Sequence, residues 1–206
     1  MLKQLRQDYC FYGRNFFERA FWAIAVYRLG QWADQCRVAP VRWFAGKVYG
    51  LIFKFSPFLT GTFLDRRTKI GSKFHIVHSG MIVIHPGAVF GDRCGVMHGV
   101  TVGVNMQGGV PRFGDDVFIG CNATVLGEIT VGDGARIAAN SLVVCDVPAG
   151  ALAIGVPAKI YPNMAQAHVG PAAAVAARAG QTPAASHNPQ PPAGAFRGIR
   201  ATGATA

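Results

Sequence analysis

The sequence predicts a mainly β protein, a parallel β-helix, with a short α-helical segment before it and a disordered tail after it. The main observation is that an apolar residue recurs every six positions from about Leu64 to Val147, often followed by glycine. A period of six fits neither an α-helix, which repeats near 3.6, nor a half-buried strand, which repeats at 2. It fits short strands joined at tight corners, with three hexads completing a coil of roughly 18 residues.

Every member of this six-residue series is aliphatic or aromatic. We place two extra residues between Ile82 and Phe90 and a longer insertion between Val102 and Phe113. Stacked coils would bury the series as a continuous internal column. The series comprises Leu64, Ile70, Ile76, Ile82, Phe90, Val96, Val102, Phe113, Ile119, Val125, Val131, Ile137 and Val143.

Residues 1–60 are predicted to be an α-helical N-terminal segment. A helix is expected over residues 14–35, because Phe17, Phe21, Ile24 and Ala25 fall on one stripe. After Pro40 a second helix is expected over about residues 41–55. It interleaves aromatic with basic side chains, namely Trp43, Phe44, Tyr49 and Phe53 with Arg42, Lys47 and Lys54.

Two interpretations of residues 41–55 stay open. The aromatic side chains could cap the open end of the coil stack or pack between subunits, with the basic groups in solvent. Alternatively, the segment rests on an anionic membrane surface, with aromatics inserted and cations at the headgroups. The second interpretation would place the protein at the inner face of the membrane.

The repeat region is expected over residues 61–162, followed by a tail over residues 163–206. The tail is rich in Ala, Pro and Gly and has few large apolar residues. Such a segment cannot bury enough surface to offset the entropy lost on ordering, so it is predicted to be disordered. We assign no chemistry to His168 and His187 within it.

Charge and cysteine content narrow the partners and the compartment. A net charge of +10 favours anionic partners such as phosphorylated cofactors or acidic lipids. No nucleic-acid-binding motif is visible, so no nucleic acid partner is expected. Five cysteines without a CxxC pair indicate reduced, mostly buried thiols. The sequence also shows no signal peptide and no apolar run long enough to span a membrane. A cytoplasmic protein is therefore predicted.

The hexads align two histidines at one corner of the coil. His78 and His98 are each third in a hexad, and these hexads lie one full coil apart. The same corner continues to Cys121 and then to Ala139. Adjacent strands stack about 4.8 Å apart, so the two imidazoles should be neighbours. Histidine suits proton transfer near neutral pH, although each could instead hydrogen-bond to the backbone of the next coil.

A metal site and a binding loop are the other features considered. His75 and His85 lie near the histidine pair, but His75 and His78 belong to different sides of the coil and no third ligand converges. No metal is therefore expected. The insertion VNMQGGVPR, residues 104–112, breaks the period with two glycines and a proline. It is predicted to be a loop that walls a cleft, or else a tolerated bulge.

Three runs resemble the hexapeptide-repeat acyltransferases, and within them the serine acetyltransferase branch, including its short members associated with exopolysaccharide synthesis. The runs are GMIVIHPGAVFGDRCGVMHGVTVG, VFIGCNATVLGEITVGDGARIAANSLVVCDVPAG and AIGVPAKI. The resemblance covers about residues 60–161. It implies a left-handed coil, a homotrimer or dimer of trimers, active sites between subunits and acetyl-CoA as acyl donor.

The resemblance also implies roles for individual residues. His78 matches the general base, which makes His78 and its neighbour His98 the candidate catalytic residues. Gly103, Cys121 and Ala139 match positions whose backbone lines the acetyl-CoA cleft, and Cys121 and Ala139 lie along the corner obtained from the hexad count. Lys159 matches a basic position near the phosphates of the cofactor, so these four residues are the candidate cofactor-binding set.

The acceptor is where the chain departs from the family. Val77 stands where the serine-specific enzymes place Asp, residues 109–110 replace an Arg-His pair, and Phe63 replaces the Asp that orients the base. Asp65, two residues away, is a candidate substitute for that Asp. The lost groups would have held the ammonium and carboxylate of an amino acid. A saccharide hydroxyl is therefore favoured over L-serine as acceptor.

These observations predict an acetyl-CoA-dependent O-acetyltransferase acting on a saccharide of an exopolysaccharide precursor or on L-serine. Two other functions are weighed against it. A non-catalytic β-helix scaffold or interaction module predicts that His78 is dispensable. A metal-dependent β-helix hydratase predicts bound zinc or iron.

Overall fold

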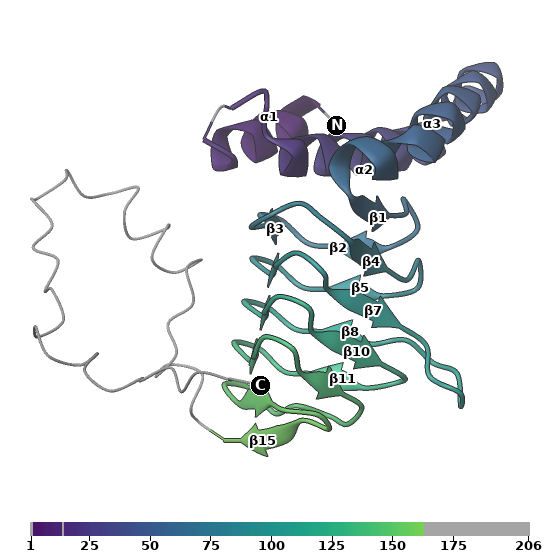
Figure 1. Cartoon of the computed structure of the whole chain (residues 1–206). Coiled ribbons are helices and arrows are strands. Elements are labelled where there is room, and N and C mark those ends of the chain that lie inside the picture. The colour runs from purple at the N-terminus through teal and green to yellow at the C-terminus, as the bar shows by residue number, and fades with distance from the viewer. Residues whose placement is uncertain (1, 14, 163–206) are drawn as a thin grey trace, which may run out of the picture.

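The computed structural model describes residues 2–13 and 15–162, so the predicted tail, with His168 and His187, lies outside the described residues. Three helices, α1 (Leu2–Phe11), α2 (Arg19–Gln35) and α3 (Ala39–Thr60), form a layer at one end of a stack of β-coils (Figure 1). α3 ends at Thr60 and the first strand begins at Thr62. The helical layer therefore sits directly on the first coil.

The coils form three sheets of short parallel strands, which confirms the predicted parallel β-helix. The first sheet contains β1 (Thr62–Leu64), β4 (Ile82–Ile84), β7 (Thr101–Gly103), β10 (Thr124–Leu126) and β13 (Leu142–Val143). The second contains β2 (Lys69–Ile70), β5 (Val89–Phe90), β8 (Arg112–Phe113) and β11 (Thr130–Val131). The third contains β3 (His75–Ile76), β6 (Gly95–Val96), β9 (Phe118–Ile119), β12 (Arg136–Ile137), β14 (Leu152–Ile154) and the antiparallel β15 (Lys159–Tyr161).

The predicted six-residue series forms the core, since every member is at most 8% exposed. One detail of its register was wrong. Strand pairing aligns Leu64 with Ile84 and Ile84 with Val102, so Ile84 rather than Ile82 continues the series. The two extra residues therefore lie before Ile84 and not between Ile82 and Phe90. Spacing could not reveal this, because Ile82 and Ile84 are both apolar and both buried.

The N-terminal helices differ from the predicted ones in number and length. α2 begins at Arg19 rather than at residue 14, after Glu18, whose side chain accepts a hydrogen bond from the backbone of Ala20. Phe17 lies outside the helix and is 91% exposed, whereas Phe21 on the predicted stripe is buried. α1 was not predicted. It is joined to α2 by a buried ion pair between Asp8 and Arg28 (3.1 Å), which sequence spacing does not reveal.

α3 extends beyond the predicted residues 41–55 at both ends. Its C-cap is Gly61, which adopts a left-handed conformation and donates its N–H to the Pro57 carbonyl at 2.8 Å. Tyr49 and Phe53 contact the first coil, the latter through the Phe63 ring at 5.2 Å. Trp43 and Phe44 are mostly exposed and do not cap the coil. Over the residues described, none of the helices has the length and apolarity needed to cross a bilayer.

The thiols are less buried than expected. All five cysteines are free. Only Cys94 is buried, however, while Cys10 and Cys145 are exposed. Burial raises the pKa of Cys94 to about 11, and its Sγ lies 3.0 Å from the Gly114 carbonyl. Cys94 is therefore an inert core residue.

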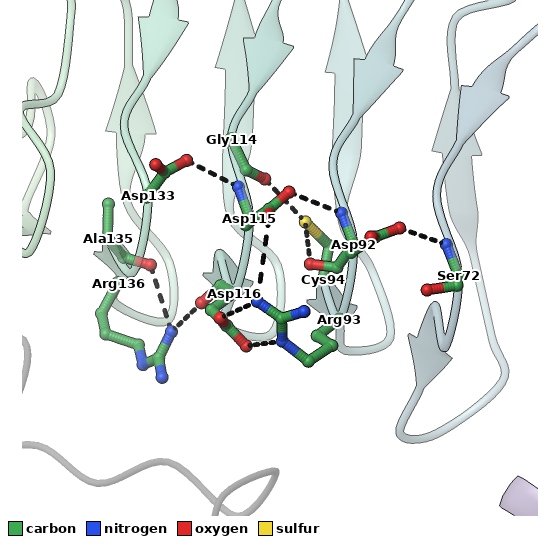
Figure 2. Close-up of polar contacts among 10 residues, drawn as sticks. All are labelled: Ser72, Asp92, Arg93, Cys94, Gly114, Asp115, Asp116, Asp133, Ala135 and Arg136. Carbon is green, nitrogen blue, oxygen red and sulfur yellow. Dashed lines mark hydrogen bonds and ion pairs between the residues drawn. The ribbon is translucent and has the colours of Figure 1, made fainter.

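A ladder of aspartates joins successive coils at one corner (Figure 2). Asp92 accepts a hydrogen bond from the backbone N–H of Ser72 (2.6 Å), Asp115 from Asp92 (2.8 Å), and Asp133 from Asp115 (2.8 Å). Each carboxylate occupies the space beside a glycine of the preceding coil. A Cβ on Gly91 would lie 2.3 Å from a carboxylate oxygen of Asp115. The glycine after the apolar residue is thus required by close approach of the next coil.

His75 anchors α1 to the first coil. Its ring meets Phe11 and Tyr12 edge-on, with centroids 5.1 and 5.8 Å apart. The Tyr12 hydroxyl also accepts a hydrogen bond from the backbone N–H of Ile76 at 2.9 Å. Burial, and secondarily the charge of nearby His78, lower the pKa of His75. The cluster therefore favours neutral imidazole.

The ladder predicts that Gly91→Ala lowers the free energy of unfolding by about 1–3 kcal/mol, because the added methyl group must displace the next coil. Urea unfolding followed by circular dichroism measures the loss. Gly46→Ala is the matched control, since nothing lies within 4 Å of its Cβ position in α3. It should leave stability unchanged or raise it by up to about 1 kcal/mol. Equal effects of both substitutions would contradict the close-approach argument.

The lowered pKa of His75 predicts that acid weakens the fold. The unfolded chain binds this proton more readily than the folded one, so the contribution is present above about pH 6.5 and is lost as the pH falls through the folded pKa. Unfolding free energies at pH 7.5 and 5.5 should differ less in His75→Phe than in the unsubstituted protein. An identical pH dependence in the two proteins would remove His75 as the cause.

Candidate active site

One corner of the coil stack carries the residues singled out for catalysis. β3 pairs in register with β6, β6 with β9, and β9 with β12. The second residue after the end of each strand lies at this corner, one per coil. These residues are His78 after β3, His98 after β6, Cys121 after β9 and Ala139 after β12. The ring centroids of His78 and His98 are 6.2 Å apart. The imidazoles are thus neighbours across two coils.

The corner at His78 bulges by two residues. Counted forward from β3, His78 is level with His98. Counted backward from β4, Gly80 is level with His98. The Gly80 carbonyl accepts a hydrogen bond from the Gly99 N–H, just as the His98 carbonyl accepts one from the Asn122 N–H in the following coil. Residues 78–80 therefore occupy the space that one residue occupies in the next coil. Sequence spacing placed these extra residues elsewhere and missed the bulge.

Neither imidazole of the pair is used for structure. His78 is exposed, His98 is half-buried, and neither side chain hydrogen-bonds to another described residue. The alternative of a corner histidine bonded to the next coil is therefore not what the structure shows. His85, by contrast, has a structural role within its own turn, since its Nδ1 accepts a hydrogen bond from the Gly87 N–H at 3.0 Å.

A pocket of about 450 Å³ opens beside the bulge. His98 contributes the only titratable side chain of its lining, and the rest is small, apolar or neutral polar. The Ser79 hydroxyl oxygen is buried and has no hydrogen-bond partner among the described residues. The full lining is Ser79, Gly80, Met81, Val83, His98, Gly99, Thr101 and Asn122.

The remaining candidate residues, Gly103 and Lys159, lie at different places on the coil stack. Gly103 ends β7 and lies level with Leu126, so it does not share the corner of Cys121 and Ala139. The column obtained from the hexad count, which runs from His78 through His98 and Cys121 to Ala139, is unaffected. Gly103 instead precedes the loop of residues 104–111, which projects from the coil stack after β7 (Figure 1). Lys159 is exposed on β15, opposite Ile154 at the end of the stack.

The expected replacement for the orienting Asp is engaged elsewhere. Asp65 accepts hydrogen bonds from the backbone N–H (2.8 Å) and Nε (2.9 Å) of Arg67 at the corner after β1. Its described contacts do not link it to His78. Within residues 2–13 and 15–162, no group of three or more His, Cys, Asp or Glu side chains is arranged to hold a metal ion.

Comparisons with known proteins agree with this architecture. Residues 111–144 match the family model "bacterial transferase hexapeptide (six repeats)". A serine acetyltransferase of Mycobacterium tuberculosis is 41% identical over 110 residues, covering 52% of this chain and 48% of its own length. One from Synechococcus elongatus is 33% identical over 143 residues, covering 68% of this chain and 56% of its own length. The chain spans about half the length of the curated relatives it matches.

Solved structures show the same similarity in three dimensions. Serine acetyltransferase from Brucella abortus superposes with a TM-score of 0.66 at 28% identity, over 78% of this chain and 68% of that one. Its complex with coenzyme A gives 0.66 at 27% identity, over 78% and 67%. The Neisseria gonorrhoeae enzyme in complex with serine gives 0.63 at 28% identity, over 77% and 68%. The chain is therefore a hexapeptide-repeat protein similar to serine acetyltransferases in sequence and in fold.

Proposed function

We propose that this protein is an acetyl-CoA-dependent O-acetyltransferase with His78 as general base. The observation that carries the proposal is an exposed imidazole with no structural partner, on a bulged corner beside a pocket. The surrounding coil is similar to enzymes whose structures contain coenzyme A or serine.

The reaction follows from the chemistry of these groups. An acceptor hydroxyl is a poor nucleophile, and His78 would remove its proton as the oxygen attacks the thioester carbonyl carbon. The tetrahedral intermediate then collapses with cleavage of the C–S bond, and the imidazolium returns the proton to the leaving thiolate. His98, which lines the pocket, would contact the acceptor or the developing oxyanion.

The acyl donor would follow the corner away from the histidines. Cys121 and Ala139 continue the same corner toward the end of the stack, where Lys159 is exposed. A cation at that end suits the phosphates of coenzyme A. Gly103 and the projecting loop after it would contact the donor from the neighbouring corner. A homotrimer, which the resemblance implies, would close this cleft with a second subunit.

The pocket favours a saccharide over L-serine as acceptor. Apart from His98, its lining contains no charged or titratable side chain. An amino acid brings an ammonium and a carboxylate, and both lose hydration without gaining a charged partner in such a pocket. The hydroxyls of Ser79 and Thr101 and the amide of Asn122 instead match the hydroxyls of a sugar. A saccharide of an exopolysaccharide precursor fits this lining.

Substitution of the proposed base tests the mechanism. His78→Ala should lower kcat by about 10²- to 10⁴-fold, the usual contribution of general-base catalysis, as measured by release of the coenzyme A thiol. His85→Ala is the control, because that histidine lies at another corner and bonds to Gly87. It should keep most of the activity. Full activity of His78→Ala would remove His78 from the mechanism.

The acceptor is tested by steady-state assays with sugars and with free L-serine. We expect thiol release with a sugar acceptor and a much lower kcat/KM with serine, because the pocket offers no charged partners for an amino acid. The acetylated product is identified by mass spectrometry. Efficient formation of O-acetylserine would defeat the saccharide assignment and leave the acetyl-transfer reaction standing.

Ligand-induced stabilisation separates the enzyme from a non-catalytic scaffold. Coenzyme A at 100 times its dissociation constant should stabilise the fold by about 2.7 kcal/mol. For a fold of this size the melting temperature should rise by roughly 5–10 °C. A scaffold without a donor site would show no shift at any concentration of coenzyme A.

A further inference from the structure

The outward side of α3 is a continuous apolar stripe that nothing in the described chain covers. Its residues are spaced four and three apart, so they lie on one side of the helix. The buried residues Ala45, Tyr49, Ser56 and Thr60 occupy the side facing the fold. The outer stripe consists of Phe44, Val48, Leu51, Phe55 and Phe58, each at least 36% exposed and Phe58 as much as 87%.

Basic side chains border the outer stripe, and α3 contains no acidic residue. Lys47 and Lys54 are seven residues apart and therefore lie on the same edge of the stripe. The ammonium of Lys47 lies 5.8 Å from the centre of the Trp43 ring. Neither lysine forms an ion pair with a described residue. The edge thus presents cations and an exposed indole together.

The helical layer carries an excess of positive charge. Only three of the ten acidic residues of the chain precede the coils, and each is already engaged. Asp8 pairs with Arg28, Asp34 with Arg66, and Glu18 accepts a hydrogen bond at the start of α2. The cations that remain exposed and without an ion pair among the described residues are Arg6, Arg19, Arg37, Arg42, Lys47 and Lys54.

An apolar groove of about 450 Å³ between α2 and α3 extends this surface. Trp22 and Val26 line it from α2, and Ile52 and Leu59 line it from α3. Arg19 stands in the same lining. A cation beside an apolar groove matches a molecule with an anionic head and an apolar chain.

We infer that the helical layer docks on a membrane surface carrying anionic phospholipids, with the outer stripe inserted among the acyl chains. Aromatic and aliphatic side chains supply buried apolar area, while bordering lysines reach the headgroups. A second copy of the chain is less suitable, because a symmetric contact would oppose the same uncompensated cations. α3 leads directly into β1, which pairs with β4 beside His78, so docking would hold the candidate site close to the lipid surface.

Vesicle flotation of the full-length protein tests the inference, with no acyl donor present, so the result is independent of the acetyl-transfer proposal. The protein should float with vesicles of phosphatidylcholine and phosphatidylglycerol, and at least tenfold more weakly with phosphatidylcholine alone. Binding should weaken as salt rises, because salt screens the headgroup charge. Trp43 emission should shift to the blue on binding, and Trp43→Phe should diminish the shift.

Two double variants identify the surface. K47E/K54E should weaken binding to anionic vesicles at least tenfold. K69E/R112E is the matched control, because it makes the same change in charge at exposed positions of β2 and β8. It should alter binding less than threefold. F44S/F55S should weaken binding while circular dichroism shows an intact fold.

Three results would overturn the inference. The first is failure of the protein to float with anionic vesicles. The second is equal weakening by K47E/K54E and K69E/R112E, which would indicate attraction by overall charge alone. The third is a large oligomer in sedimentation velocity that F44S/F55S dissociates, together with no flotation, which would assign the outer stripe to contacts between copies of the chain.

Discussion

The structure depends on the close approach of each coil to the next. Parallel strands of successive coils are hydrogen-bonded, and the buried series fills the space inside them. At the aspartate ladder the approach is so close that a single methyl group on Gly91 would overlap the carboxylate of Asp115. Because the coils cannot separate, a residue at one level determines where its counterparts at other levels lie. Columns of side chains, including the histidine corner, are a direct consequence.

The six-residue period predicted the fold because each side of each coil must bury one apolar residue for the coils to stack. It predicted the alignment of His78 with His98 for the same reason. It failed at the bulge, since Ile82 and Ile84 are equally apolar and only strand pairing distinguishes them. It also could not show that Asp65 is held by Arg67. Such contacts depend on side-chain geometry, which a period does not encode.

The helical layer illustrates another limit of sequence patterns. Aromatic residues in α3 were compatible with a cap on the coil or with an outward surface. The structure divides them, with Tyr49 and Phe53 turned toward the first coil and Trp43 and Phe44 exposed. The sequence alone does not show which charges of the helical layer remain unpaired. The structure does, because Asp8 and Asp34 form ion pairs with Arg28 and Arg66. A modest excess of basic residues thereby becomes a face on which Glu18 is the one carboxylate without an ion pair among the described residues.

The bulge of residues 78–80 lies between strands and not within one. Its length can therefore change without shifting the register of either adjoining coil, since β3 and β4 are held independently by their own neighbours. If the proposed acetyl transfer takes place at this corner, a change of turn length would alter the acceptor site without altering the strand pairing that stabilises the coils. Under the proposed function, exchanging this short turn among related coils would therefore be a route to new acceptor preferences on an unaltered scaffold.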